Sequence, residues 1–362
     1  MKKFLKIFAM IVSGIIIISA AALLLFGRDA HSNLSGKTPE QIDQYLTNEG
    51  FQGAVLIAKD GEVLFEKGYG EAAPDVKNTP DTLYQIASLS KTFTATAVMQ
   101  LAEKKLLSVD DPLSAYFPDF PNAKNITIGH LLSHSSGIPD YLNPEFEFDY
   151  GKKWDPNDIV DVVSDADLEF TRGESYAYSN TGYVLLGLII EKVSGQSYAE
   201  YISEHIFKPA GMKNSMFEFT KEMPRAAGNV EGKPGPAMDH SAAYAAGDII
   251  STAEDLSLFY KSLHNNELVS KETGNLMKAT HAKKFPYQYG YGWYTQEVMG
   301  HKAVGHSGGY PSGFRHYVAH LQEEDLLVIV LSNEMSINSK AINRNLTSIV
   351  LKKPIWVWEK QL

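Results

Sequence analysis

The sequence predicts an α+β fold in which one antiparallel sheet, built from both ends of the chain, is flanked by helices and joined to a helical lobe. Two alternating apolar stretches come early, at residues 53–59 and 63–69, and several more come late, between residues 289 and 332. Such alternation is typical of half-buried strands. Helical patterns precede the early pair and follow the late group, so we expect a single sheet covered by helices.

The first elements of the folded region carry their own boundary signals. Thr38 followed by Pro39 opens an apolar pattern of helical period and predicts a capped helix with proline in its first turn. The dipeptide Asp60-Gly61 separates the two early strands and is typical of a tight hairpin. Residues 88–105 are rich in Ala, Thr, Leu and Met, which predicts a long helix that is buried on most faces.

The middle of the chain differs from its ends. Residues 111–239 contain short helical patterns, such as 183–194, with many prolines and aromatics and few alternating stretches. They are expected to form the helical lobe, inserted between two parts of an α/β lobe, 39–110 and 240–362. The later elements expected are a helix at 253–264, strands at 289–296, 302–306, 313–321 and 326–332, and a helix at 338–352.

Composition excludes several classes of protein. The chain has 362 residues, of which 44% are hydrophobic and 21% charged, as in an ordinary globular protein. A net charge of -10 argues against a nucleic-acid partner, which would require a basic surface. The absence of cysteine excludes disulfides, thiolate nucleophiles and thiolate metal sites.

The N-terminal residues 1–27 are predicted to be a membrane anchor or a signal segment. Lys2, Lys3 and Lys6 precede an uncharged apolar stretch, 7–26, which is long enough to span a bilayer as a helix. The lysines would keep that end in the cytoplasm and place a folded domain, 39–362, outside the cell membrane after a linker at 28–38. The alternative is a secreted protein released by signal cleavage, because small alanines lie near the end of the apolar stretch.

The first chemical motif is Ser88-Leu-Ser-Lys91. Residues three apart share a helix face, so Ser88 and Lys91 can meet while Ser90 points elsewhere. A buried lysine has a lowered pKa and can act as the base for a serine nucleophile. A Ser-x-x-Lys pair is common by chance, and alone it equally fits a serine at a helix start followed by an unrelated lysine.

Two further motifs follow in order. Tyr178-Ser-Asn180 lies just before a helical pattern and can place a phenol and an amide in one cleft, although Tyr and Asn are also frequent loop residues. His306-Ser307-Gly308 ends a predicted strand, where backbone N–H groups can face an oxyanion and glycine permits close approach. The alternative interpretation of His306-Ser307-Gly308, the third motif, is a plain glycine-rich turn.

Together the three ordered motifs resemble those of the serine β-lactamase and penicillin-binding-protein superfamily, in particular its class C-like branch of D,D-carboxypeptidases, D-aminopeptidases and esterases. The resemblance extends over about residues 40–350. The stretches that support it are 84–99, 131–137, 178–187, 206–212 and 246–255. It implies a β-lactamase/transpeptidase-like fold that needs no cofactor and no metal.

The resemblance also implies roles for single residues. Ser88 would be acylated, Lys91 would be its amine partner and Tyr178 the base for deacylation. Asn180 would bind substrate, as would His306, Ser307 and Gly308 of the third motif. The backbone N–H groups of Ser88 and Gly309 would form the oxyanion hole.

One departure from the family pattern concerns the third motif, which is usually Lys-Thr-Gly. Histidine is charged only part of the time near neutrality, so it anchors a substrate carboxylate less well than lysine does. Efficient hydrolysis of β-lactams is therefore not expected, while their binding stays open. The substrates that the resemblance implies are D-amino-acid peptides of the cell wall, or related small-molecule amides and esters. The alternative is a wall-binding or regulatory protein of the same fold with little catalysis.

Two other groups of residues are not assigned to the active site. His130 and His134 are spaced as in a zinc-binding helix, but the leucines between them indicate packing. The acidic residues Asp161, Asp165, Asp167 and Glu169 are expected to lie on a solvated helix face.

Overall fold

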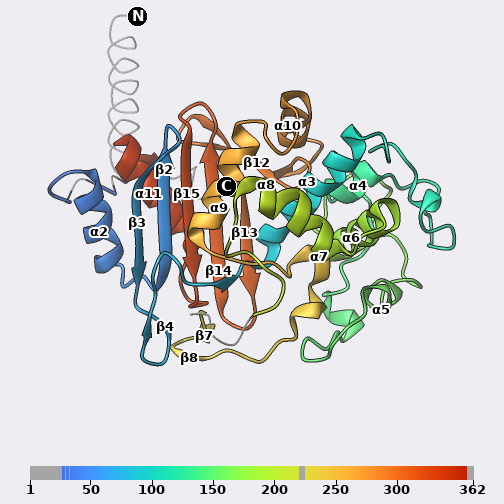
Figure 1. The fold of residues 1–362 in the computed structure, drawn as a ribbon, viewed down its shortest axis with the longest axis horizontal. Helices are drawn as coiled ribbons and strands as arrows, with labels where there is room; N and C mark the ends of the chain where they lie inside the picture. The colour runs from blue at the N-terminus through green and yellow to red at the C-terminus, as the bar shows by residue number, and fades with distance from the viewer. Residues whose placement is uncertain (1–26, 29, 32, 220–224, 357–362) are drawn as a thin grey trace, which may run out of the picture.

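The computed structural model describes residues 27, 28, 30, 31, 33–219 and 225–356. Its main sheet has eight antiparallel strands, in the order β10, β11, β12, β13, β14, β15, β2, β3 (Figure 1). Their bounds are β10 Ala282–Lys284, β11 Tyr287–Tyr289, β12 Tyr294–Val298, β13 His301–Tyr310, β14 Phe314–Leu321, β15 Leu326–Ser332, β2 Gly53–Lys59 and β3 Glu62–Tyr69. The pairing of β2 with β15 confirms that both ends of the chain build one sheet.

The early hairpin has the turn that its sequence predicts. Asp60 and Gly61 both have positive φ, 53° and 76°. A two-residue hairpin turn of this type needs two left-handed residues, which Asp and Gly adopt more readily than most others.

One predicted strand is two strands in the structure. The stretch 289–296 is divided between β11 and β12 by a turn that includes Gly292, whose φ is +83°. In that turn the Gly290 N–H donates to the Trp293 carbonyl at 2.8 Å. An alternating pattern does not reveal such a turn, because the apolar Tyr291 and Trp293 are buried in it as they would be in a strand.

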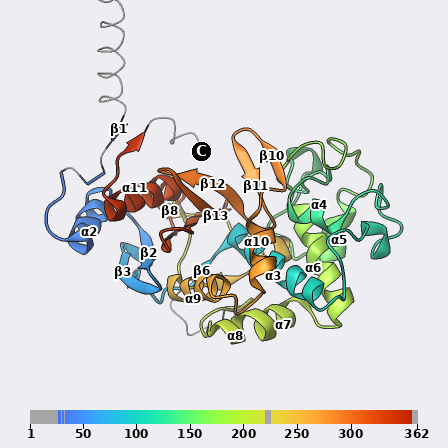
Figure 2. The same ribbon diagram turned by 90° about the horizontal axis from the view of Figure 1, so that it is seen from above.

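Helices cover both faces of the sheet. On one face lie α2 (Thr38–Asn48) and α11 (Ser339–Leu351), and on the other lie α3 (Ser90–Glu103) and α9 (Ala253–His264) (Figure 2). Successive residues of a strand point to opposite faces, so β2 contributes side chains to two hydrophobic cores, one on each side of the sheet. Val55 packs in the cluster with α2 and α11, whereas Leu56 packs in the larger cluster with α3 and α9.

The start of α2 differs in detail from the prediction. Thr38 is the first helical residue, and Lys37 occupies the capping position without a side-chain hydrogen bond. Pro39 lies in the first turn as expected, where its missing N–H leaves no helical bond unmade. The helix therefore depends on its buried face, which includes Ile42 and Leu46.

The helical lobe is built around α6 (Asn180–Ser194), at the right of Figure 1. The shorter helices α4 (Ile128–Leu132), α5 (Pro156–Asp161) and α7 (Tyr198–Ile202) contact it, and α8 (Lys208–Ala210) contacts α9. Gly187 allows a close crossing on α6, because a Cβ at this position would lie 2.4 Å from the Cβ of Ala245. The domain bounds expected from the sequence, with a helical lobe at 111–239, stay a prediction.

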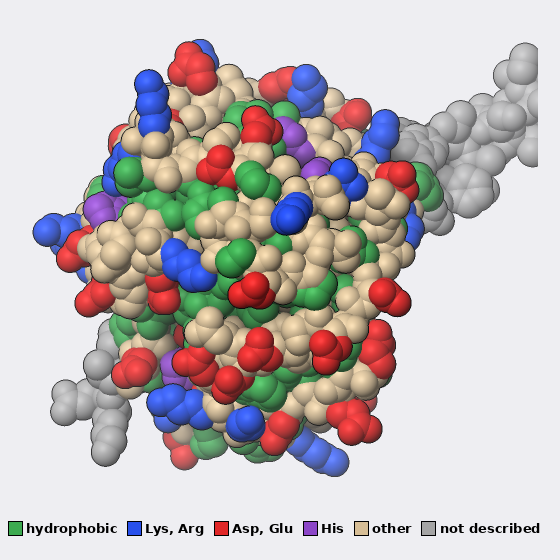
Figure 3. All heavy atoms as spheres, turned by 90° about the vertical axis from the view of Figure 1, so that its right-hand side faces the viewer, with side chains coloured by type: hydrophobic (Ala, Val, Ile, Leu, Met, Phe, Trp, Pro, Cys, Tyr) green, Lys and Arg blue, Asp and Glu red, His purple; other side chains and the backbone are tan. Residues whose placement is uncertain are grey.

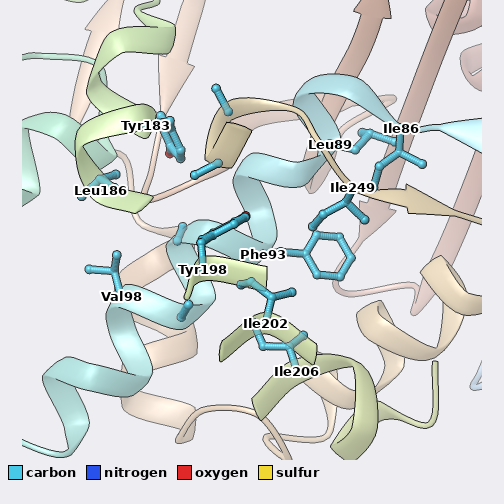
Figure 4. Close-up of a cluster of buried hydrophobic side chains, with 14 of the residues drawn as sticks. Ile86, Leu89, Phe93, Val98, Tyr183, Leu186, Tyr198, Ile202, Ile206 and Ile249 are labelled. Carbon is cyan, nitrogen blue, oxygen red and sulfur yellow. The ribbon is translucent and has the colours of Figure 1, made fainter. Parts of the chain in front are cut away.

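Helix α3 lies between the sheet and the helical lobe. Every residue from Ser90 to Leu101 is buried, as its composition predicts. Phe93 is central to this packing and stacks on Phe259 of α9 with ring centroids 3.8 Å apart. Figure 4 shows Phe93 among apolar side chains that come from α3, α7 and the segment before α9. The helix that carries the chemical motif is therefore fixed from all sides.

Acidic side chains are spread over the outer face of the helical lobe (Figure 3). Asp161, Asp165, Asp167 and Glu169 are all at least partly exposed, as expected, although only Asp161 belongs to a helix.

The localisation expected from the sequence requires a correction. Within the described part of the chain, no helix has both the length and the apolar character needed to cross a membrane. This finding contradicts the prediction of a single-pass membrane protein. The stretch 7–26, on which that prediction rested, lies outside the described residues. At the boundary between the predicted segment 1–27 and the predicted linker 28–38, Gly27–Arg28 forms β1, which pairs with β16 (Ile355–Trp356).

Candidate active site

Ser88 lies in a single 3₁₀ turn, η1 (Ala87–Leu89), directly before α3. Ala87, the residue before it, has a φ of +50°, which is strained for a residue with a Cβ. The turn is held by β6 (Tyr84–Gln85), whose partner strand is β9 (Ile250–Ser251). Ser90 points away from Ser88, because its hydroxyl accepts the Ile249 N–H at 3.2 Å.

Lys91 is fully buried and reaches Ser88. Its Nζ lies 3.1 Å from Ser88 Oγ, and it also donates to Asn180 Oδ1 and to the Ala246 carbonyl, both at 2.7 Å. Burial lowers the pKa of Lys91 to about 7, although the carboxylate of Asp140 acts in the opposite direction. A substantial fraction of this amine is therefore neutral, and able to accept a proton, near pH 7.

Asn180 connects Lys91 to an acid that the sequence interpretation did not single out. It is the first residue of α6, and its Nδ2 donates to Asp140 Oδ2 at 2.7 Å. Burial raises the pKa of Asp140, while its hydrogen bonds and Lys91 partly offset this rise. The three side chains form one continuous hydrogen-bonded row.

Tyr178 lies beside the same amine. The Lys91 Nζ is 4.9 Å from the centre of the Tyr178 ring. The Tyr178 hydroxyl is buried and finds no partner of hydrogen-bonding geometry among the described residues. Burial, together with the nearby Tyr294 phenol, raises the pKa of this phenol well above 10, and the adjacent Ser88 side chain acts in the opposite direction. Tyr178 is therefore protonated at neutral pH.

His134 holds the loop that carries Tyr178. Its Nδ1 accepts the backbone N–H of Ser179 at 3.1 Å, and its ring centroid lies 4.3 Å from that of Tyr178. The residue is buried and has a positive φ of 56°, so its position depends on the surrounding packing. His130 instead caps its own helix, since its Nδ1 accepts the Thr127 N–H.

The third motif lies on β13. His306 is buried: its Nδ1 donates to the Ser307 carbonyl at 2.6 Å, and its Nε2 accepts from the Tyr289 hydroxyl at 2.8 Å. Burial, together with the nearby Lys91, lowers the pKa of His306 to about 3. The histidine is therefore uncharged at neutral pH. Its neighbour Ser307 is exposed on the opposite face of the strand.

The edge of β13 that carries this motif is open. Strand β12 pairs with β13 only as far as Gly305, opposite Tyr294. Beyond it, Gly308 lies against the turn that holds Ser88, because a Cβ on Gly308 would be 2.4 Å from the Ile86 carbonyl oxygen. Gly309 has more space, since the nearest atom to its Cβ position is 3.6 Å away. The glycine pair thus brings the strand edge next to Ser88.

A cavity of about 640 Å³ adjoins this strand edge. Its lining includes Ser307, Gly308, Gly309, Tyr287, Arg315 and Tyr317. Small-molecule sites have volumes of this order and combine aromatic walls with a few polar groups. Two cationic side chains on its wall, Arg315 and Lys340, carry a positive charge that His306 does not.

The predicted residues thus come together from separate segments. Ser88, Lys91, Asn180 and Tyr178 form one contact cluster, and His306 joins it through the ring of Tyr178 at 6.2 Å between centroids. Sequence interpretation missed Asp140 and the orienting contact of His134. The only sequence signal for either residue is that both lie in or beside the stretch 131–137.

A family model described as Beta-lactamase matches residues 40–349. The chain belongs to the beta-lactamase family. The resemblance inferred from the three motifs is confirmed, since the relatives below are penicillin-binding proteins and amidases of the same superfamily.

Among curated proteins of Bacillus subtilis strain 168, the putative penicillin-binding protein PbpX is 34% identical over 263 residues, and penicillin-binding protein 4* is 32% identical over 314 residues. These alignments cover 70% and 78% of the present chain. They cover only 65% and 68% of the two relatives, so the chain spans about two thirds of their length.

A solved structure of D-amino acid amidase from Ochrobactrum anthropi SV3 superposes with a TM-score of 0.75 at 25% sequence identity. The match covers 87% of this chain and 98% of that one. Family and relatives together support a serine hydrolase of β-lactamase/transpeptidase-like α+β fold.

Proposed function

We propose that this protein is a serine amidohydrolase that forms an acyl-enzyme at Ser88. The observation that carries the proposal is the 3.1 Å contact between Ser88 Oγ and a fully buried Lys91 whose pKa is lowered to about 7. A neutral amine at this distance can accept the serine proton, which is what activates a hydroxyl nucleophile.

Acylation follows from this geometry. As Ser88 Oγ attacks the substrate carbonyl carbon, its proton passes to Lys91 and the carbonyl oxygen becomes an oxyanion. The backbone N–H groups of Ser88 and Gly309 are proposed to receive that charge, because the turn before a helix and the open strand edge lie side by side. The C–N bond then breaks, and the leaving amine takes up a proton.

Tyr178 is proposed as the group that transfers this proton. Its protonated hydroxyl is buried beside Ser88 and uses no hydrogen bond to the described residues of the resting site. It can give a proton to the leaving amine and regain one from Lys91. In deacylation a water molecule attacks the ester, its proton returns through Lys91 and Tyr178, and Ser88 recovers its hydroxyl. The sum is amide plus water giving acid plus amine.

The substrate class proposed is that of D-amino-acid amides and short peptides with D-residues. The amidase of known structure supports this choice by its name, and the uncharged His306 argues against a fixed cation at the position where the family usually has lysine. Asn180, with one side of its amide on Lys91, is proposed to position the substrate carbonyl and the lysine together.

The test is turnover by the purified full-length chain of D-alanyl-D-alanine peptides, D-amino-acid amides, an activated ester and a chromogenic cephalosporin. We expect amide or ester hydrolysis, with a covalent adduct on Ser88 detected by mass spectrometry of the quenched reaction. Ser88→Ala should lower kcat by at least about 10⁴-fold and abolish the adduct.

Ser90→Ala is the matched control. It removes a hydroxyl two residues away that bonds Ile249, so it should cost about 1 kcal/mol of stability but leave the adduct intact. If the wild-type chain forms no adduct with any of these substrates, the protein is not a hydrolase of this class. Binding of wall fragments that persists in Ser88→Ala would then favour a binding role.

A further inference from the structure

Away from Ser88, three potential metal ligands converge at the junction of α9 with the β14–β15 hairpin. His264 is the last residue of α9, His320 lies near the end of β14, and Asp325 lies in the turn before β15. One ligand atom from each residue lies within 4.8 Å of the other two. Within the described residues, this is the group whose spacing fits a bound ion.

Two ligand–ligand distances describe this cluster, and the shorter one is also a hydrogen bond between His320 and Asp325. His320 Nε2 is 3.0 Å from Asp325 Oδ1, and His264 Nδ1 is 3.9 Å from the same oxygen. Ligands about 2.0–2.2 Å from a tetrahedral zinc ion lie a little over 3 Å apart, so only small side-chain movements are required. Two imidazoles and one carboxylate are ligands that zinc accepts.

A cavity of about 130 Å³ opens beside the three ligands. His264, His320 and Asp325 all line this cavity, together with Tyr260. The cavity has room for a water molecule that would complete the coordination of a metal held by these three residues.

One charged side chain near the three potential ligands is a lysine. Lys261 also lines the cavity, but its ammonium is directed to the Gly61 carbonyl at 3.4 Å. Asp325 supplies the one carboxylate of the cluster. His264 is exposed, which gives an ion a route from solvent, whereas His320 is buried.

We propose that His264, His320 and Asp325 form a zinc site that fastens the C-terminal end of α9 to the β14–β15 hairpin, with water as the remaining ligand. The site is separate from the row of residues around Ser88 and does not depend on the proposed hydrolase function. Its expected role is structural, because it joins two elements that are far apart in the sequence.

The experiment uses the full-length chain, purified without a histidine tag and stripped with a chelator. Cobalt(II) is titrated first, because its visible absorption reports low coordination number, and zinc is then titrated in competition with a chromophoric chelator. We expect one equivalent of metal, the cobalt absorption of a four- or five-coordinate site, and a higher melting temperature that the chelator reverses.

His264→Ala is the main variant, since an exposed side chain can be removed without loss of folding. It should weaken zinc binding by at least about tenfold and abolish the shift in melting temperature. Asp325→Asn should do the same, while the control His281→Ala, an exposed histidine elsewhere, should change neither. Absence of stoichiometric binding, or binding that is unchanged in both site variants, would overturn the proposal.

Discussion

Lys91 and Asp140 face each other across a single amide group. Asn180 accepts from Lys91 Nζ with its Oδ1 and donates to Asp140 Oδ2 with its Nδ2, both at 2.7 Å. The carboxylate raises the pKa of Lys91 against the stronger effect of burial, which lowers it to about 7. The charge of Asp140 thus raises the pKa of Lys91, the proposed base, although the two side chains are not in contact.

The first prediction concerns pH. Because Lys91 must be neutral to accept a proton, kcat/KM should be low below pH 7, rise as the pH passes through about 7, and level off above it. Asp140→Asn removes the negative charge that raises the pKa of Lys91, so the rise should move to lower pH. The amide oxygen of the substituted side chain can still accept from Asn180, so the orientation of the Asn180 amide is preserved.

Initial rates measured across pH for wild type, Asp140→Asn and Asp140→Ala test this expectation. The alanine variant also loses the acceptor for Asn180 and should show a lower kcat in addition. A rise that stays in place, or moves to higher pH, in Asp140→Asn would contradict the tuning role.

The second prediction concerns His306. With a pKa of about 3, His306 is neutral at any pH above about 4, so it contributes no pH-dependent charge to substrate binding. The ratio of KM for a D-peptide with a free carboxylate to KM for its C-terminal amide should therefore change with pH in the same way in wild type and in His306→Gln, from about pH 5 to 8. A rise of this ratio through about pH 6 to 7 that is lost in His306→Gln would reveal a histidine that charges.

The third prediction uses two adjacent glycines. Gly308→Ala places a Cβ 2.4 Å from the Ile86 carbonyl oxygen, and backbone cannot easily move away, so we expect a loss of about 1–3 kcal/mol of unfolding free energy. Displacement of the Ser88 turn should also lower kcat by on the order of 100-fold. Denaturant unfolding and steady-state kinetics measure both effects.

Gly309→Ala is the matched control in the same strand. Its Cβ would lie 3.6 Å from the nearest atom, so its stability should change by no more than about 0.5 kcal/mol. Equal destabilisation by both substitutions would show that the close approach of β13 to the Ser88 turn is not what requires glycine at 308.

The fourth prediction concerns His134. His134→Phe removes the acceptor for the Ser179 N–H and puts a bulky residue at a φ of 56°, so it should cost at least about 1–3 kcal/mol and lower kcat. His134→Asn suits positive φ and keeps an acceptor, so it should retain more activity than the phenylalanine variant. If the two variants lose activity equally at temperatures where both are folded, His134 does not position Tyr178 through this bond.

Local signals determined much of the fold. The Asp60-Gly61 turn, the helix at 253–264 and the strand at 326–332 occur with the predicted bounds, because each depends on turn chemistry or on a periodicity that is complete within the segment. The Ser88 and Lys91 pair is of the same kind, since a spacing of three residues near a helix start brings two side chains together.

Tertiary structure alone decided the electrostatics of the site and the division of the stretch 289–296. Asp140 acts on Lys91 only because α6 and the preceding loop place Asn180 between them. His306 is neutral because folding buries it beside Lys91 and Tyr289. Burial and charge are properties of assembled neighbours, so no pattern along the chain contains them; the sequence supplied the reacting groups, and the packing sets their protonation.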